Sequence, residues 1–396
     1  MDYIDMRYAD LTQRIAGESV GTWTTHYEAM HRMDAGEDIF LLSIGQESDM
    51  LSPPGVVAAG ISSIESGRHH YTAVEGDRAL REVIAQRHAE QNNKDIDPDC
   101  VTVFSGAQNA LFATAQVLLQ AGDEVILIEP YYTTYPATVT ASGATLVPVV
   151  LTPEESFQLD AQRVIEAITP RTRVIVINSP NNPTGAIYTR EPLQALIDVC
   201  RERNIWLVSD EVYMDVVEDP TLCRPFALDG AENVVISISS VSKTHRMTGW
   251  RVGWAIGPKE ISRHYYNLNM CMIYGLPGFT QEAALHALRY EHEVTSQITR
   301  RLAKQRAVVI EELESIPGTE LYRGGGGMFV MMNIGSLGVD AMDFAAGLLD
   351  AEGVSVQPCN GFGENCGNLI RISAVLKEDS LREACKRIVR YIAPVT

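Results

Sequence analysis

The sequence predicts an α/β fold, in which a large domain with a mainly parallel seven-stranded sheet covered by helices is followed by a smaller α+β domain. Two observations lead to this prediction. Between residues 101 and 256, short and almost wholly apolar runs alternate with helical patterns, as strands buried on both faces of a sheet require. Near residue 282 the pattern changes to a charge-laced helical stretch and then to further strands.

The strands of the large sheet are expected at seven apolar runs. In chain order they read "VTVF", "EVILIE", "TLVPVV", "RVIVIN", "IWLVS", "NVVISIS" and "VGWAI". One long helix is expected over residues 282–316. The glycine run after Arg323 is expected to form a flexible turn that leads into another strand. We therefore predict an N-terminal arm that packs with the small domain (1–50), a large domain (51–285), and an interdomain helix with the small C-terminal domain (286–396).

Composition and charge exclude several classes of protein. The 396 residues include 51 acidic and 32 basic side chains, and a net charge of -19 repels nucleic acid and anionic membranes. No apolar run approaches the roughly 20 residues that span a bilayer, and the first residues lack the pattern of a signal peptide. The seven cysteines are scattered, so we expect packing thiols and no metal site. A cytoplasmic protein without nucleic-acid or membrane partners is expected.

Polar residues follow directly after several of the predicted strands. Open α/β sheets bind ligands beyond the carboxyl ends of their strands, where residues far apart in the sequence meet. The residues expected to converge there are Ser105 to Gln108, Tyr132, Asn182, Asp210, Tyr213 and Ser240 to Lys243.

Lys243 lies just after the run "NVVISIS", where an ammonium group is costly to bury. A desolvated lysine has a lowered pKa, and its neutral amine can form a Schiff base with an aldehyde such as pyridoxal 5'-phosphate. The alternative is an ordinary solvated lysine on a loop. Taken alone, the segment does not exclude that alternative.

Other residues supply what this cofactor needs. A phosphate binds hydroxyls, cations and the free N–H groups of a helix N-terminus, and a pyridine nitrogen stays protonated beside a carboxylate such as Asp210. Asn182 and Tyr213 are suited to the ring oxygen, and Tyr132 to stacking on the ring. Each also has a plainer interpretation as a helix cap, a turn or a core residue. The candidates for the phosphate are Gly106, Ala107, Gln108, Ser240, Ser242 and Arg251.

With Lys243, Asp210, "NNPTG" and the Arg251 segment in the same order, the chain resembles the class I/II aminotransferases of fold type I, from "YTAVEGDRALREVIA" to "LIRIS". The resemblance implies pyridoxal phosphate bound to Lys243, which then moves protons, with Asp210 at the pyridine nitrogen. It also assigns Asn182 and Tyr213 to the ring oxygen, Tyr132 to the face of the ring, and the phosphate candidates of the preceding paragraph to the phosphate. It also implies that Arg371 and Gly45 bind the substrate carboxylate together with Asn182. Tyr71 would reach the phosphate of the other subunit in a homodimer.

The chain departs from the family's pattern in two places. The third residue after the lysine is Arg246, where a solvated or helix-capping arginine is expected, and the loop "IGQESDMLSP" lacks the usual proline. The segment "NMCMIYGLPGF" has no arginine, which disfavours aspartate as substrate. Several segments resemble the subfamily that transfers the amino group of arginine to pyruvate. Glu47 and Asp49 are then candidates for binding a guanidinium, with a solvated loop as the alternative.

Three other functions share part of this pattern. A lyase or another Cα reaction on the same fold shares the lysine chemistry, so the sequence leaves it open. The effector domain of a transcription regulator would need a basic DNA-binding module, for which this acidic chain has no room. A dinucleotide-dependent dehydrogenase would need a GxGxxG motif after a strand, and none is present. The sequence therefore predicts an aminotransferase whose donor is arginine or another basic or neutral amino acid.

Overall fold

The large sheet is the centre of the fold. The computed structural model describes residues 6–16, 18–47, 51–217 and 219–393. Its seven-stranded sheet has the order β2-β8-β7-β6-β5-β3-β4, and only β8 runs antiparallel to its neighbours. The prediction of a mainly parallel seven-stranded sheet is confirmed. In chain order the strands are β2 (Val101–Phe104), β3 (Glu124–Glu129), β4 (Thr145–Val150), β5 (Thr172–Asn178), β6 (Trp206–Asp210), β7 (Val235–Ser240) and β8 (Gly253–Ile256).

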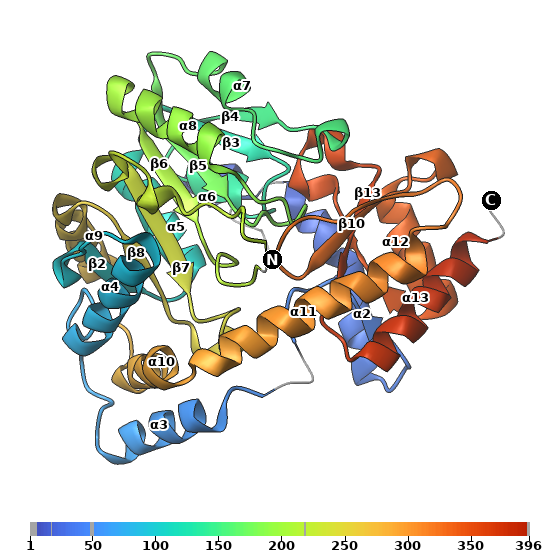
Figure 1. The fold of residues 1–396 in the computed structure, drawn as a ribbon, viewed down its shortest axis with the longest axis horizontal. Coiled ribbons are helices and arrows are strands. Elements are labelled where there is room, and N and C mark those ends of the chain that lie inside the picture. The colour runs from blue at the N-terminus through green and yellow to red at the C-terminus, as the bar shows by residue number, and fades with distance from the viewer. Residues whose placement is uncertain (1–5, 17, 48–50, 218, 394–396) are drawn as a thin grey trace.

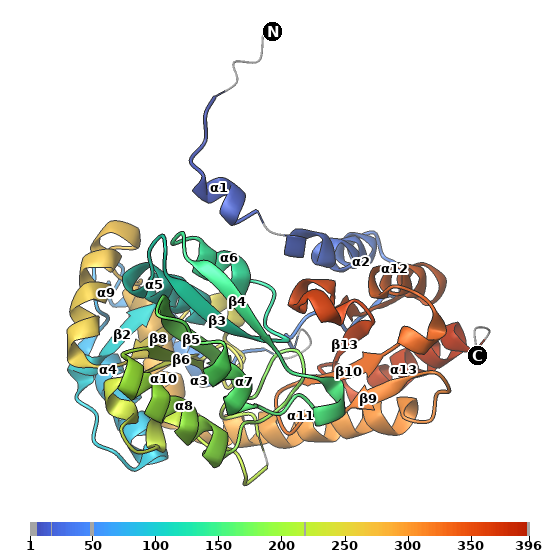
Figure 2. The same ribbon diagram turned by 90° about the horizontal axis from the view of Figure 1, so that it is seen from above.

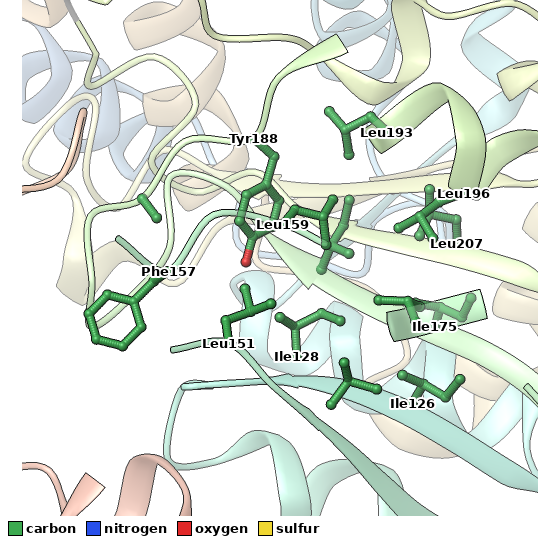
Figure 3. Packing of buried hydrophobic residues seen from close by; sticks show 14 of the residues in the cluster. Ile126, Ile128, Leu151, Phe157, Leu159, Ile175, Tyr188, Leu193, Leu196 and Leu207 are labelled. Atoms are coloured by element: carbon green, nitrogen blue, oxygen red, sulfur yellow. The ribbon is translucent and has the colours of Figure 1, made fainter. Parts of the chain in front are cut away.

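Both faces of this sheet are buried, which explains the apolar runs. Along β3, Ile126 and Ile128 pack into one core cluster, while Val125 and Leu127 pack into another on the opposite face. Figure 3 shows the first cluster, where Leu193 and its neighbours lie over the strands. The covering helices are α5 (Ala107–Leu118), α6 (Tyr135–Thr140), α7 (Ala161–Glu166), α8 (Arg190–Arg203) and α9 (Lys259–Met272).

The helices that precede and follow the large sheet in the chain pack against one another at its edge. Helix α10 (Gly278–Tyr290) packs against α3 (Pro54–Glu65) and α4 (Arg78–Asn92). The cluster between them includes Val56, Leu80 and Leu288, all buried. These contacts bring the chain before β2 and the chain after α9 to the same side of the sheet.

The predicted long helix is two helices, so that expectation is wrong. Helix α10 ends at Tyr290, and α11 (His292–Leu313) begins after Glu291, whose φ of -103° and ψ of 38° are not helical. The two helices pack against different elements: α10 against α3, and α11 against α13 (Glu378–Ile392). Figure 1 shows α11 running from the large sheet to the smaller one. A common helical pattern in the sequence therefore conceals a change of direction.

The smaller sheet has the order β12-β13-β10-β9 and is antiparallel throughout. Its strands are β9 (Glu320–Tyr322), β10 (Phe329–Asn333), β12 (Gln357–Pro358) and β13 (Leu369–Ser373). Helices α11, α13 and α12 (Ala341–Glu352) share a core with it. The domain boundaries near residues 50 and 285 stay a prediction.

The N-terminal segment reaches this second sheet region. Strand β1 (Phe40–Leu41) pairs in parallel with β11 (Val354–Ser355), and α2 (Thr24–Asp34) packs against α12. Helix α1 (Leu11–Arg14) stands apart from both sheets (Figure 2), although Arg14 Nε donates to Thr140 O at 3.0 Å. In the part of the chain that the structure describes, no helix has the length and apolar character to cross a bilayer.

Candidate active site

The polar residues that follow the strands meet in one cavity of about 270 Å³, beyond the carboxyl ends of β5, β6 and β7. Most of the predicted site residues line it, and these are Gly45, Ala107, Gln108, Tyr132, Asn182, Asp210, Tyr213, Ser240, Ser242, Lys243, Arg251 and Arg371. Gly106 lies beside the cavity in contact distance of Arg251, and Tyr71 lies elsewhere. The structure therefore brings together residues up to 326 positions apart in the chain, from Gly45 to Arg371.

Lys243 projects into this cavity from the turn after β7. Its Nζ donates to Gly45 O at 2.7 Å and lies 5.9 Å from the centre of the Tyr213 ring. Burial lowers the pKa of the Lys243 ammonium to about 8, with the positive charges of Arg371 and Arg251 acting in the same direction and Asp210 opposing them. A lysine with this pKa is about one tenth neutral at pH 7, far more than an ordinary lysine, and the neutral amine is the nucleophile.

Asp210 ends β6 and is buried at the bottom of the cavity. Tyr135 Oη donates to its Oδ2 at 2.5 Å, and the Val212 N–H donates to Oδ1 at 3.2 Å. Burial raises the pKa of Asp210, while these two hydrogen bonds and the charge of Lys243 act to lower it. A buried carboxylate in this setting is stabilised by a cation placed against it.

Arg371 lies in the middle of β13 and is 1% exposed. Its Nη1 donates to Asn182 Oδ1 at 2.9 Å and its Nη2 donates to Ser43 O at 2.6 Å. The guanidinium carbon lies 4.3 Å from the centre of the Phe329 ring. Burial lowers the pKa of this arginine. Both of these acceptors are neutral, so the arrangement suits a carboxylate that binds the guanidinium as a bidentate partner.

The other end of the cavity is formed by the N-terminus of α5. Gly106 has a φ of +83°, and a Cβ there would lie 2.5 Å from Arg251 Nη2, so glycine is required on both counts. Arg251 Nη1 donates to Thr248 O at 2.9 Å. The Gln108 side chain bonds to Thr134 and Thr138, so it offers the cavity its backbone. These features suit the binding of an anion.

The charges lining the cavity are unbalanced. Among its described lining residues, Lys243, Arg251 and Arg371 are basic, and Asp210 is the only acidic one. Buried cations require anionic partners. The site is therefore suited to a ligand with more than one negative charge, held between the α5 end and Arg371.

Tyr71 does not reach the cavity of its own chain. Its side chain is 88% exposed, and its ring packs edge-on against Tyr274 at 5.2 Å between centroids. An exposed aromatic pair of this kind is unusual on a free surface. The role that the resemblance gives it, in the site of a second subunit, stays a prediction.

Arg246 is neither solvated nor a helix cap, so that expectation is wrong. Its Nε donates to Glu47 Oε2 at 2.8 Å, and Glu47 Oε1 contacts Arg301 of α11. The Glu47 side chain is 5% exposed, and Arg246 has a φ of +53°, which is unfavourable for a residue with a Cβ. Glu47 is therefore not a carboxylate on a solvated loop. Asp49, the other candidate, lies outside the described residues.

Glu47→Gln is expected to lower the free energy of unfolding by about 3 kcal/mol, because Arg246 and Arg301 lose a buried charge that they share. Urea unfolding followed by circular dichroism measures this. Glu314→Gln is the matched control, since its partner Arg323 is 65% exposed and such pairs contribute less than about 1 kcal/mol. Equal effects of the two substitutions would contradict the role of Glu47.

The sequence analysis missed several residues of the site. Tyr135 holds Asp210, and Asn178 Nδ2 donates to Asp210 O at 3.0 Å while its Oδ1 accepts from the Asn182 N–H at 2.7 Å. Tyr135 follows Tyr132 by three residues and Asn178 ends a strand, so both gave a signal. Phe329, Phe362 and Trp23 gave none, because apolar residues look alike whether they line a core or a site.

Comparisons with known proteins agree with this geometry. The family model described as aminotransferase class I and II matches residues 37–388. An arginine–pyruvate transaminase of Pseudomonas aeruginosa is 44% identical over 97% of this chain and 97% of its own. An aspartate/prephenate aminotransferase of Thermus thermophilus is 32% identical over 96% of this chain and 98% of its own.

The fold is also that of solved aminotransferases. The structure of Thermus thermophilus aspartate aminotransferase with maleate has a TM-score of 0.91, is 31% identical in sequence, and covers 98% of this chain and 100% of its own. The match spans both sheets and the cavity between them. This chain therefore belongs to the class I and II aminotransferases and transfers the amino group of an amino acid to a 2-oxo acid.

Proposed function

We propose that the cavity holds pyridoxal 5'-phosphate, joined to Lys243, and that the protein uses it to pass an amino group from donor to acceptor in two half-reactions. The observation that carries the proposal is the convergence of three groups in one cavity. These are a lysine with a pKa near 8, a buried carboxylate that calls for a cation, and an arginine whose acceptors are neutral. When bound, the cofactor supplies an electron sink for the bond that breaks at the substrate Cα.

The residues present fit this cofactor. Asp210, oriented by Tyr135, would hold the pyridine nitrogen protonated. Tyr213 and Asn182 would bond to the ring oxygen, and Tyr132 would stack on the ring. The phosphate would lie at the N-terminus of α5, where excess positive charge and a glycine-lined turn already favour an anion. Its ligands would be Gly106, Ala107, Gln108, Ser240, Ser242 and Arg251.

Arg371 and Lys243 would have different roles toward the substrate, namely binding and proton transfer. Arg371 would bind the α-carboxylate of every amino acid and oxo acid, with Asn182 and the backbone of Gly45 beside it. That contact would hold the substrate Cα in the same cavity as Lys243. Lys243 would then carry the proton between the substrate Cα and C4' of the cofactor, because its pKa of about 8 allows it both to accept and to release a proton near neutral pH.

The uptake of the cofactor by the cofactor-free protein is expected to depend on pH. With a pKa of about 8, Lys243 is about one tenth neutral at pH 7 and about nine tenths neutral at pH 9. The rate of uptake should therefore rise about tenfold over this interval and then level off. Stopped-flow absorbance measures the rate. A rate that keeps rising steeply above pH 9 would contradict the lowered pKa.

The protein is further proposed to be a homodimer with shared sites in the cytoplasm. A second chamber of about 450 Å³ adjoins Lys243 and is lined by Ser242, Thr248, Trp250 and Phe279. Tyr71 and Tyr274 project outward as an exposed pair, and Val57, Ile61 and Ile64 expose apolar surface on α3. Tyr71 of the partner subunit would enter the second chamber, on the side of the proposed phosphate site.

Arginine, or another basic or neutral amino acid, is proposed as the donor and pyruvate as the acceptor. The 44% identity to an arginine–pyruvate transaminase supports this choice. Glu47 is the only acidic residue among the described lining of the second chamber, and it is already paired with Arg246 and Arg301. A guanidinium donor would therefore have to share Glu47 with these arginines.

A panel of amino acids tested against pyruvate and 2-oxoglutarate measures the donor and the acceptor. Formation of alanine only when pyruvate is present supports transamination. Release of ammonia from an amino acid without an oxo acid would instead favour the lyase. Treatment with borohydride tests the cofactor independently of turnover. It should remove the visible absorption band and leave the cofactor permanently attached to Lys243.

A further inference from the structure

A small polar chamber lies behind the site, separate from the cavity that holds Lys243. Its volume is about 40 Å³. It is formed between α4, the segment that follows β6, strands β7 and β8, the turn after Lys243 and α10. The polar residues that line it are Arg87, His88, Gln91, Glu211, Asp215, Arg224, Ser237, Ser239, Ser240, Thr244 and His245. None of them except Ser240 belongs to the proposed site.

Two imidazoles in this chamber have an unsatisfied nitrogen. His88 is 6% exposed and His245 is 0% exposed, and the Nε2 atom of each has no hydrogen-bond partner among the described residues. The other nitrogen of His245, Nδ1, lies 2.8 Å from Thr244 Oγ1. A buried polar atom without a partner costs about 1–3 kcal/mol. Both atoms therefore point to a ligand within the chamber.

Glu211 is the acidic group of the chamber that is free of an ion pair with a described residue. Ser237 Oγ donates to its Oε1 at 2.8 Å, and burial raises the pKa of Glu211 to about 7. Asp215, by contrast, is paired with Arg224 and approached by Arg87. The charged or titratable groups facing Glu211 are Arg87 and His88 of α4, Asp215, Arg224 and His245, and His292 of α11 reaches them through Arg87.

The size and polarity of the chamber identify the ligand class. One water molecule needs about 10–15 Å³ of such volume and two to four polar partners. The chamber therefore has room for about three or four water molecules and is too small for an organic ligand. Hydroxyl, carboxyl and imidazole groups on its walls provide the partners.

The chamber touches the chain beside two key residues of the site. Glu211 directly follows Asp210, and its backbone is held by Ile238 O at 2.7 Å and by Ser239 Oγ at 3.4 Å. His245 lies two residues after Lys243, and its N–H donates to Val241 O at 3.2 Å. The chamber and the site therefore share the backbone that carries Asp210 and Lys243.

We propose that this chamber is an internal water site and that Glu211 and His245, joined through its waters, are positioning residues that hold Asp210 and Lys243 against the cofactor. The inference rests on the proposed attachment of the cofactor to Lys243. It assigns a role to two buried groups that do not touch the reacting atoms.

The first test compares three variants of the cofactor-loaded protein by the pH midpoint of the visible absorption band. Glu211→Ala is expected to shift that midpoint by about half a pH unit or more. Glu211→Gln is expected to restore it, because its Oε1 still accepts from Ser237. Glu124→Ala is the matched control: Glu124 is also buried, but it lies at the opposite end of the sheet and pairs with Arg171. Its midpoint should equal that of the unmodified protein.

The second test asks whether Glu211 and His245 act together. In a cycle of Glu211→Ala, His245→Leu and the double variant, the shift of the double variant should be smaller than the sum of the single shifts. If Glu211→Ala does not fold, Ser237→Ala removes the same hydrogen bond and takes its place. A crystal structure of the loaded protein should contain ordered water between Glu211 and His245.

Additive shifts, an unmoved midpoint in Glu211→Ala, or a dry chamber would each overturn the inference. An unmodified protein that binds pyridoxal phosphate without a visible band at Lys243 would instead overturn the proposed function. The two failures are thus distinguished by the spectrum of the unmodified protein alone.

Discussion

Replacing Lys243 by alanine is expected to abolish amino transfer, with turnover reduced by a factor of about 10⁴ or more. Proton transfer by one positioned side chain contributes up to about 10⁴-fold, and the covalent attachment of the cofactor is lost in addition. The visible band of the loaded protein should disappear as well. Turnover is measured as alanine formed from pyruvate, and the band by absorbance after dialysis against the cofactor.

Lys259→Ala is the matched control for this substitution. Lys259 is 61% exposed on α9 and pairs with Asp99, so its loss should leave both the band and the turnover unchanged. Retained turnover in Lys243→Ala would contradict the assignment of the lysine. An unchanged melting temperature of cofactor-free Lys243→Ala protein would show that the loss is chemical, because the hydrogen bond that the Lys243 side chain makes to Gly45 O is its only direct contribution of this kind among the described residues.

Arg371→Ala is expected to lower kcat/KM for all amino acids and oxo acids alike, by roughly 30- to 5,000-fold. This corresponds to a loss of about 2–5 kcal/mol of binding free energy in the transition state. The substrate carboxylate would lose a buried partner, and Asn182 Oδ1 and Ser43 O would lose a donor. Steady-state kinetics with several donors and with pyruvate measure the effect. The common group of all these substrates is the α-carboxylate, so the losses should be similar.

Arg323→Ala provides the control, because Arg323 is 65% exposed and pairs with Glu314 at the surface. It should leave kcat/KM unchanged for every substrate. If Arg371→Ala affects only one donor, Arg371 is not the shared carboxylate ligand. The visible band of Arg371→Ala should persist, which separates the loss of substrate binding from the loss of the cofactor.

The large sheet could be predicted from the sequence because its strands are buried on both faces. Val125 and Ile126 are adjacent and point to opposite sides, yet each meets a core cluster, so the run has no polar residue to obscure it. The same reasoning failed for α10 and α11. Both helices have charged and apolar residues at the same helical periodicity, and the turn at Glu291 involves neither proline nor glycine.

The site residues that could be predicted from the sequence are reactive side chains that directly follow a predicted strand. Lys243 and Asp210 directly follow apolar runs, so a sheet alone brings them to one edge. Arg371 and Gly45 came only from the resemblance, because neither of them follows a strand of the large sheet. The contacts of Glu47 with Arg246 and Arg301 were not predictable, since they depend on how α11 crosses the loop after β1.

The position of Arg371 has a consequence for how the protein unfolds. It lies on β13 of the small sheet, but its acceptors are Asn182 after β5 and Ser43 after β1. A bound ligand that spans Arg371, Lys243 and the α5 end joins both sheets, and a ligand at one hundred times its Kd adds about 2.7 kcal/mol to the folded state. Calorimetry of the loaded protein should accordingly record one cooperative transition, while removal of the ligand lets the two sheets melt at separate temperatures.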